Sequence, residues 1–262
     1  MQTISRLQAM KQKGEKIACL TAYDALFTYF ADQAGLDLLL VGDSMGNTVQ
    51  GHTDTIPVTL EEMCYHTRCV ARGNQNAFLL GDLPFLTYTN PQQTLESSAK
   101  IMQSGAQMVK LEGGRWLVET FEILTTRGIP VCAHLGLTPQ SVRRLGGYKI
   151  QGRDQNSAER IFEDALLLEK AGAQLLVLEG IPKILGKRIT EALKIPTIGI
   201  GAGPDCDGQV LILHDLLGLI RGKPLTFAKN FLQDSGNILE AFKAYREAVK
   251  SGSFPGLEHC FD

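Results

Sequence analysis

The stretch Leu38-Leu39-Leu40-Val41-Gly42-Asp43-Ser44 decides the fold, because it is a short apolar run that ends in a carboxylate and a hydroxyl. Four consecutive apolar residues before a glycine are typical of a strand that is buried on both faces, as in a parallel sheet. Side chains alternate along a strand, so we expect Leu39, Val41 and Asp43 to share one face. A carboxylate is a poor residue for a strand interior, and its place at the end of this run indicates a functional site.

Three further apolar runs end in an acid, at Asp82, Glu112 and Glu179. These runs belong to a series of eight expected strands, nearly all of them followed by an expected helix. The expected strands cover residues 16–21, 38–43, 78–82, 108–112, 129–134, 174–179, 197–201 and 210–214. The expected helices cover residues 3–11, 24–34, 59–72, 91–103, 116–127, 157–171, 182–193 and 238–250.

Eight strand–helix units within 262 residues predict a closed (β/α)₈ TIM barrel. We expect one domain, residues 1–262, with a short N-terminal helix and a C-terminal helix; an open, doubly wound sheet is the alternative. Only 13 positions separate Gly201 from His214, so the last connecting helix should be short or absent. The active site of a TIM barrel lies at the carboxyl ends of its strands, where the strand-end acids should meet.

The composition argues against several classes of partner. The formal net charge of −2 gives no electrostatic reason to expect nucleic acid or an anionic membrane as a partner. No run reaches about 18 apolar residues, and the N-terminus has no apolar signal core. The six cysteines form no CxxC pair, which is typical of reduced thiols in a cytoplasmic protein. We therefore expect a cytoplasmic protein that acts on small molecules.

Asp43, Asp82 and Glu112 end the second, third and fourth strands, which are neighbours in a barrel. Three carboxylates at close range repel one another unless a cation lies among them. Oxygen ligands suit a hard ion, so these residues predict a Mg²⁺ site. The alternative is that each acid caps the helix that follows its strand.

Three other polar residues should face the same site, and two of them have a second interpretation. Lys110 shares a strand face with Glu112, so it is either a cationic clamp for an anionic substrate or half of an internal ion pair. His134 is either a hydrogen-bond partner of the substrate or a satisfied core histidine. Ser44 follows Asp43 at the strand end and could hold a substrate carboxylate.

Glu179 ends the sixth strand, away from the three acids on strands two to four. This separation suits a general base better than a metal ligand, and we interpret Glu179 as the catalytic proton acceptor.

Several longer segments resemble the ketopantoate hydroxymethyltransferase family almost from end to end. The segments that carry the resemblance are Thr21-Ala22-Tyr23-Asp24, Val41-Gly42-Asp43-Ser44, Gly81-Asp82-Leu83-Pro84-Phe85, Val109-Lys110-Leu111-Glu112-Gly113-Gly114, His134-Leu135-Gly136-Leu137-Thr138-Pro139-Gln140, Gly146-Gly147-Tyr148-Lys149, Leu178-Glu179, Ile198-Gly199-Ile200-Gly201-Ala202-Gly203 and Phe227-Ala228-Lys229-Asn230-Phe231. The resemblance implies a TIM barrel of the phosphoenolpyruvate/pyruvate-like superfamily.

The same resemblance implies an activity and a set of roles. Family members transfer a hydroxymethyl group from 5,10-methylenetetrahydrofolate to 3-methyl-2-oxobutanoate, giving 2-dehydropantoate for pantothenate and coenzyme A biosynthesis. By likeness Asp43, Asp82 and Glu112 correspond to the Mg²⁺ site and Glu179 to the proton acceptor. Substrate contacts would come from Asp43, Ser44, Asp82, Lys110 and His134. The family also implies a large homo-oligomer, often a decamer.

Two other functions stay open at this point. One is a metal-dependent 2-oxo acid lyase with the same barrel and metal site, which would have no use for folate. The other is a non-catalytic barrel that serves as a scaffold, against which the intact set of acids, lysine and base argues.

Overall fold

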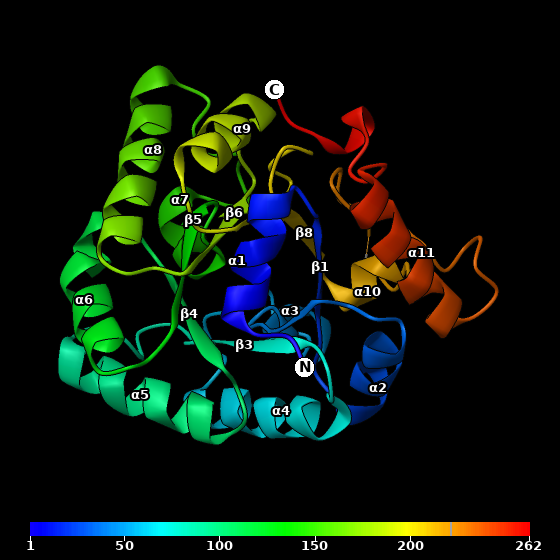
Figure 1. Ribbon diagram of the computed structural model, residues 1–262, viewed down its shortest axis with the longest axis horizontal. Coiled ribbons are helices and arrows are strands. Elements are labelled where there is room, and N and C mark those ends of the chain that lie inside the picture. The colour runs from blue at the N-terminus through cyan, green and yellow to red at the C-terminus, as the bar shows by residue number, and fades with distance from the viewer. Residues whose placement is uncertain (221) are drawn as a thin grey trace.

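In the computed structural model, eight parallel strands close into a barrel in sequence order, with β8 paired back to β1 (Figure 1). The structure describes residues 1–220 and 222–262. The strands are β1 (Ile17–Thr21), β2 (Leu38–Val41), β3 (Phe78–Asp82), β4 (Met108–Glu112), β5 (Val131–Gly136), β6 (Leu175–Glu179), β7 (Thr197–Ile200) and β8 (Gly208–Leu211). The predicted TIM barrel is therefore confirmed, and the open sheet is wrong.

Helices surround the barrel, as expected for a right-handed series of strand–helix units (Figure 1). They are α1 (Ile4–Lys13), α2 (Ala25–Gln33), α3 (Met45–Thr48), α4 (Leu60–Gly73), α5 (Pro91–Gln103), α6 (Val118–Thr126), α7 (Val142–Leu145), α8 (Gln155–Lys170), α9 (Lys183–Ala192), α10 (Leu213–Leu216) and α11 (Ile238–Ser251). Local sequence explains the helix starts. Thr59 and Glu62 form a capping box at the start of α4, and Asp24 accepts hydrogen bonds from backbone N–H groups in the first turn of α2. No helix among the described residues is both long and apolar enough to span a membrane.

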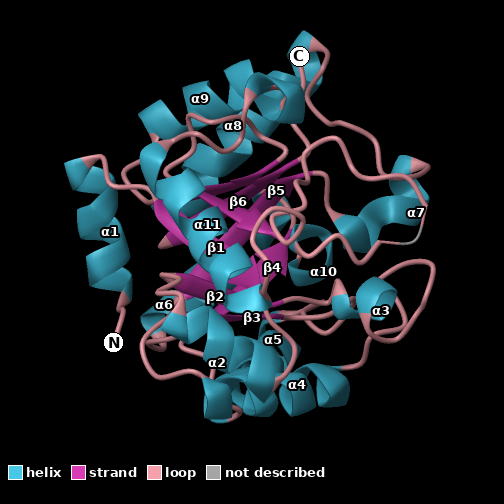
Figure 2. Ribbon diagram, turned by 90° about the vertical axis from the view of Figure 1, so that its right-hand side faces the viewer, coloured by secondary structure: helices cyan, strands magenta, loops and turns pink. Residues whose placement is uncertain are grey.

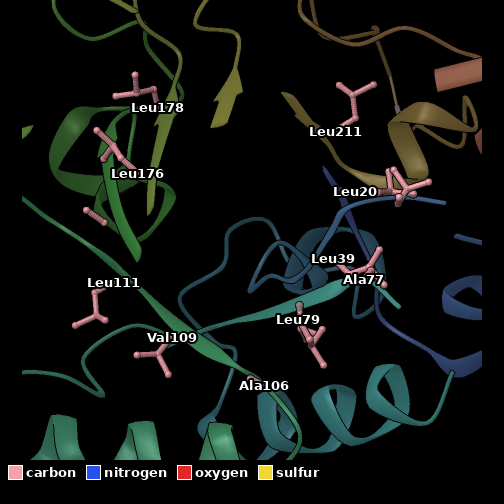
Figure 3. Packing of buried hydrophobic residues seen from close by; sticks show 14 of the residues in the cluster. Leu20, Leu39, Ala77, Leu79, Ala106, Val109, Leu111, Leu176, Leu178 and Leu211 are labelled. Carbon is pink, nitrogen blue, oxygen red and sulfur yellow. The ribbon is translucent and has the colours of Figure 1, made fainter. Parts of the chain in front are cut away.

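Each strand is buried on both faces, and its two sets of side chains belong to two apolar layers. Leu39, Leu79, Val109 and Leu111 lie in the layer between the strands and the helices (Figure 3). The side chains of opposite parity, such as Leu38, fill the inside of the barrel with those of the other strands. Burial on both faces is why the strands appear as unbroken apolar runs in the sequence.

The two ends of the barrel are built differently (Figure 2). Helix α1 lies across the end where the strands begin, and its Leu7 and Met10 join the interior layer with Ile17 and Leu38. The short helices α3, α7 and α10 lie at the opposite end, where the strands finish. The beginning of the barrel is thus closed by apolar packing, and the polar strand ends face the other opening.

Some expected boundaries were wrong. The last strand ends at Leu211 instead of 214, and His214 lies in α10, because the Leu213 backbone N–H donates to Thr21 Oγ1 and leaves the ladder. Strand β5 runs two residues further than expected, to Gly136. The connection after β2 contains helix α3, which is not among the expected helices, and the expected helix after β4 begins with a 3₁₀ turn at Arg115–Leu117. Residues 201–207, all described, form no helix, as expected for that connection.

Candidate active site

One cavity of about 720 Å³ opens at the carboxyl ends of the strands. All seven residues that the sequence predicts for the site line it, namely Asp43, Ser44, Asp82, Lys110, Glu112, His134 and Glu179. The barrel brings them together because parallel strands present their last residues at one end.

Lys110 lies at the centre of the acid cluster. Its Nζ is 2.8 Å from Asp82 Oδ1 and 3.8 Å from Glu112 Oε1, and only 3% of its side chain is exposed. Burial lowers the pKa of the Lys110 ammonium, but the charges of Asp82, Glu112 and Asp43 outweigh burial and raise it. Lys110 is therefore charged, and the internal ion pair that the sequence left open is present.

Asp43 joins the cluster, but strand alternation does not place it there as expected. Leu39 and Val41 belong to the outer layer, so the prediction that Asp43 shares their face is wrong. Strand β2 ends at Val41, and Gly42 turns the chain so that the buried Asp43 lines the cavity. A Cβ at Gly42 would lie only 2.9 Å from Ser44 Oγ, so a larger residue there would displace the Ser44 hydroxyl. The Asp43 backbone N–H then donates to Asp82 Oδ2 over 3.1 Å.

The carboxyl groups of the cluster differ in their protonation. Burial, together with the charges of Asp82 and Glu112, raises the pKa of Asp43 well above its ordinary value. Burial also raises the pKa of Asp82, although Lys110 opposes it. For Glu112 burial is outweighed by His134 and Lys110, so its pKa is lowered. Negative charge is thus compensated at Glu112 and under-compensated at Asp43 and Asp82.

The oxygen atoms of the three acids are the type of ligand that a hard cation prefers, but the side chains are not arranged as a metal site. Three buried carboxylates share one ammonium and one imidazole, so ionisation of all three would leave an excess of negative charge, which a divalent ion with oxygen ligands would compensate. Within the part of the chain that the structure describes, no group of three or more His, Cys, Asp or Glu side chains is arranged to hold a metal ion. The Lys110 ammonium, which is ion-paired with both Asp82 and Glu112, accounts for this spacing.

His134 connects the acid cluster to Glu179. Its Nδ1 is 3.2 Å from Glu112 Oε1 and 3.1 Å from Lys110 Nζ, and its Nε2 is 3.3 Å from Glu179 Oε2. Burial and Lys110 lower the pKa of the imidazole, but Glu112 and Glu179 raise it to about 8 overall. At neutral pH the ring is therefore mostly protonated; its Nδ1–H faces Glu112, whereas Nε2 forms no hydrogen bond with a residue that the structure describes.

Glu179 is the most accessible of the four strand-end acids in the cavity. Its side chain is 15% exposed, against 2–3% for those of Glu112 and Asp82. It comes from β6, whereas the other three acids follow β2, β3 and β4. A carboxylate that faces the open part of the cavity can reach a bound molecule, as a general base requires.

Ser44 is held by a residue that the sequence did not assign to the site. The Tyr23 hydroxyl and Ser44 Oγ are 2.9 Å apart, and burial raises the pKa of Tyr23 to about 12. Tyr23 is therefore a neutral hydroxyl that orients Ser44 at the cavity wall.

Gln140 and Tyr88 were also missed, although they join two of the acids. The Gln140 side-chain amide donates to Asp43 Oδ2 over 2.8 Å, and its backbone N–H donates to Glu112 Oε2 over 3.0 Å. The Tyr88 hydroxyl donates to Gln140 Oε1 and to the Glu112 carbonyl. The only signal in the sequence was the position of Gln140 at the end of the segment that begins with His134.

Comparisons with solved structures agree with this fold. Phosphonopyruvate hydrolase, in complex with oxalate and Mg²⁺, matches with a TM-score of 0.63 and 14% identity, over 99% of this chain and 93% of that one. The 2,3-dimethylmalate lyase, a member of the PEP mutase/isocitrate lyase superfamily, matches with a TM-score of 0.61 and 16% identity, over 100% of this chain and 91% of that one. At such identities these likenesses concern the barrel alone.

Comparisons of the sequence are more specific. The family model described as ketopantoate hydroxymethyltransferase matches residues 1–257. The 3-methyl-2-oxobutanoate hydroxymethyltransferase of Idiomarina loihiensis is 58% identical over 259 residues, which cover 99% of this chain and 97% of the relative. Together with the strand-end cluster of acids, lysine and histidine, these matches show that the chain belongs to the ketopantoate hydroxymethyltransferase family.

Proposed function

We propose that the chain transfers a hydroxymethyl group from 5,10-methylenetetrahydrofolate to 3-methyl-2-oxobutanoate, giving 2-dehydropantoate for pantothenate and coenzyme A biosynthesis. One observation carries the proposal. A single cavity holds a buried cluster of three acids at the ends of β2 to β4 and, across the barrel on β6, a more accessible carboxylate. A reaction that removes a proton next to a ketone needs a base and a group that stabilises negative charge on the ketone oxygen. The accessible carboxylate would supply the first, and a cation held by the cluster would supply the second.

We propose Mg²⁺ as the cation, with Asp43, Asp82 and Glu112 as the residues that hold it. The pKa values of Asp43 and Asp82 are raised by burial and by repulsion from neighbouring acids, which supports the proposal that a cation binds here. When bound, Mg²⁺ would act as a Lewis acid toward the keto and carboxylate oxygens of the substrate.

The other side chains of the cluster would bind and orient the oxo acid. Lys110 is charged and buried, so it would attract the substrate carboxylate. Ser44 lies at the cavity wall with its hydroxyl fixed by Tyr23 and would donate to a substrate oxygen. The His134 ring, which is held between Glu112 and Glu179, would offer an N–H group to the same oxygens.

Glu179 would take the C3 proton of 3-methyl-2-oxobutanoate. The resulting carbanion would form a bond to the methylene carbon of the folate. That carbon would leave the folate nitrogens, and a water molecule would supply the hydroxyl, so that tetrahydrofolate and 2-dehydropantoate are the products. The neighbouring His134 is mostly protonated at neutral pH, which leaves Glu179 as the available base on this side of the cavity.

One assay tests the proposed activity. Product should form from 3-methyl-2-oxobutanoate and 5,10-methylenetetrahydrofolate in the presence of Mg²⁺ and should disappear when either the folate or the metal is withheld. A 2-oxo acid lyase would instead cleave its substrate without folate. A scaffold protein would show no turnover under any of these conditions.

Three broader properties belong to the same proposal. We propose one barrel domain over residues 1–262, a cytoplasmic location, and a homo-oligomer, for which the family resemblance suggests a decamer. Sedimentation velocity of the purified protein would measure the number of subunits directly.

A further inference from the structure

The cavity has a second part that the acid cluster does not use. Its wall on the β7 and β8 side is apolar, formed by Ile200, Val210, Ile212, Phe227 and Phe261. Pockets of 300–1,000 Å³ typically hold ligands of drug size, and a small 2-oxo acid fills only a fraction of 720 Å³. The remaining space therefore suits a larger, flat and largely apolar molecule beside the oxo acid.

Asp215 is the acid on this side of the cavity. It belongs to α10, whose start is tied to β1 by the hydrogen bond from the Leu213 N–H to Thr21 Oγ1. Asp215 lines the cavity and is only 8% exposed. Its Oδ2 is buried, and no hydrogen bond or ion pair to its side chain is formed by any residue that the structure describes. Burial alone raises the pKa of Asp215 to about 6, so the group is mostly ionised at neutral pH.

An ionised carboxylate without a partner inside a protein is costly unless a ligand satisfies it. A carboxylate accepts two parallel N–H groups particularly well, because its oxygens match the spacing of such donors. A reduced pterin carries such a pair, the 2-amino group and the adjacent N3–H, on a flat ring with an apolar face. We propose that Asp215 binds this edge of the pterin of tetrahydrofolate, with a rotation of its carboxylate that brings the buried Oδ2 to the cavity, an inference that rests on the folate-dependent function proposed above.

The test compares the wild-type protein with Asp215→Asn, which keeps the size of the side chain but can no longer accept two N–H groups. Asp205→Asn is the matched control, because Asp205 is an exposed aspartate that does not line the cavity. Isothermal titration calorimetry with tetrahydrofolate should give a dissociation constant about 10- to 100-fold higher for Asp215→Asn, from the usual strength of hydrogen bonds to a charged group. Asp205→Asn should bind like the wild type.

A second ligand separates direct pairing from a structural effect. The wild-type protein should bind 2-desamino-2-methyltetrahydrofolate about as weakly as Asp215→Asn binds tetrahydrofolate. The variant should bind both ligands with similar affinity, since the pairing is already lost. Equal affinity of wild type and variant for tetrahydrofolate would overturn the proposal. So would a variant that still distinguishes the two ligands as the wild type does, or a wild-type protein that binds no tetrahydrofolate.

The proposed function can fail independently of this inference. Exchange of the C3 proton of 3-methyl-2-oxobutanoate in D₂O without folate reports on the acid cluster and Glu179 only. If Asp215 pairs with the pterin while exchange and product formation are absent, the reaction is wrong and the pterin site stands. If product forms with the same folate dependence in Asp215→Asn, the reaction stands and the pterin site is wrong.

Discussion

Replacing Glu179 by glutamine removes the proposed base and leaves the shape of the side chain almost unchanged. The glutamine amide can still lie 3.3 Å from His134 Nε2, so the geometry of the cavity should persist. Because Glu179 is not among the acids of β2 to β4, the variant should still bind Mg²⁺ and 3-methyl-2-oxobutanoate. The change therefore separates proton removal from binding.

The expected size of the effect follows from the neighbours of Glu179. Loss of a positioned general base typically slows a reaction by about 10²–10⁴-fold, or roughly 3–5 kcal/mol of barrier. His134 is the nearest group that could replace it. With a pKa of about 8, only about a tenth of the rings are neutral at pH 7, so rescue by His134 is small. The structure thus favours a loss of at least about 10²-fold.

The assay is exchange of the C3 proton of 3-methyl-2-oxobutanoate in D₂O with Mg²⁺ and without folate, followed by proton NMR. Wild-type protein should exchange this proton, and Glu179→Gln should nearly lose the exchange at unchanged substrate affinity. Glu122→Gln on α6, an exposed glutamate outside the cavity, is the matched control and should exchange normally. Exchange by Glu179→Gln at the wild-type rate would refute the reasoning, since another residue would then take the proton.

Three further changes test the cluster and the cavity wall. Asp82→Ala should lose Mg²⁺ binding, measured by calorimetry, together with activity, while circular dichroism shows an intact barrel; wild-type turnover that persists after dialysis against a strong chelator would contradict this metal site. Lys110→Met should weaken binding of 3-methyl-2-oxobutanoate by about 2–5 kcal/mol, the usual range for a buried charge left without its partner, whereas unchanged affinity would leave only the internal ion pair. Asp215→Asn should stabilise the ligand-free protein. Burial raises the folded-state pKa of Asp215 from 3.8 to about 6. The protein is therefore most stable with respect to this group below pH 3.8, where Asp215 is neutral, and loses stability as the pH rises through 6, because the buried group then ionises. The variant should thus gain up to about 3 kcal/mol over the wild type at pH 8 and little at low pH, as measured by urea unfolding; a difference that does not depend on pH would contradict this origin.

The barrel could be predicted because its strands are short and buried on both faces. Such strands appear as apolar runs, and Leu38 to Val41 is one of them. The last strand was harder to place, because it begins with Gly208, a poor strand residue. A Cβ at that position would lie 2.4 Å from the Ile17 carbonyl oxygen, so packing against β1 requires the glycine. Close approach of this kind leaves no periodic signal in a single sequence.

The site residues that lie on strands could be predicted from the sequence, and those in turns and short helices could not. Asp82, Lys110, Glu112, His134 and Glu179 belong to strands, so their shared end of the barrel was foreseeable. Asp215 reaches the cavity, and Gln140 and Tyr88 reach the acids that line it, from turns and short helices, whose directions depend on tertiary packing. Asp43 shows the limit between the two cases, because strand alternation stops at Val41 and the Gly42 turn decides where its carboxylate lies.

The distribution of charge in the cluster indicates where a cation is needed. Glu112 has His134 and Lys110 as positive neighbours and accepts the Gln140 backbone N–H, and its pKa is lowered. Asp43 accepts one amide N–H from Gln140, and Lys110 is its main compensating charge among the described residues, so burial and its acidic neighbours raise its pKa. Positive charge is therefore missing on the side of Asp43 and Asp82. A cation that binds there would let both acids ionise, while Lys110 and His134 continue to compensate Glu112 and face the substrate.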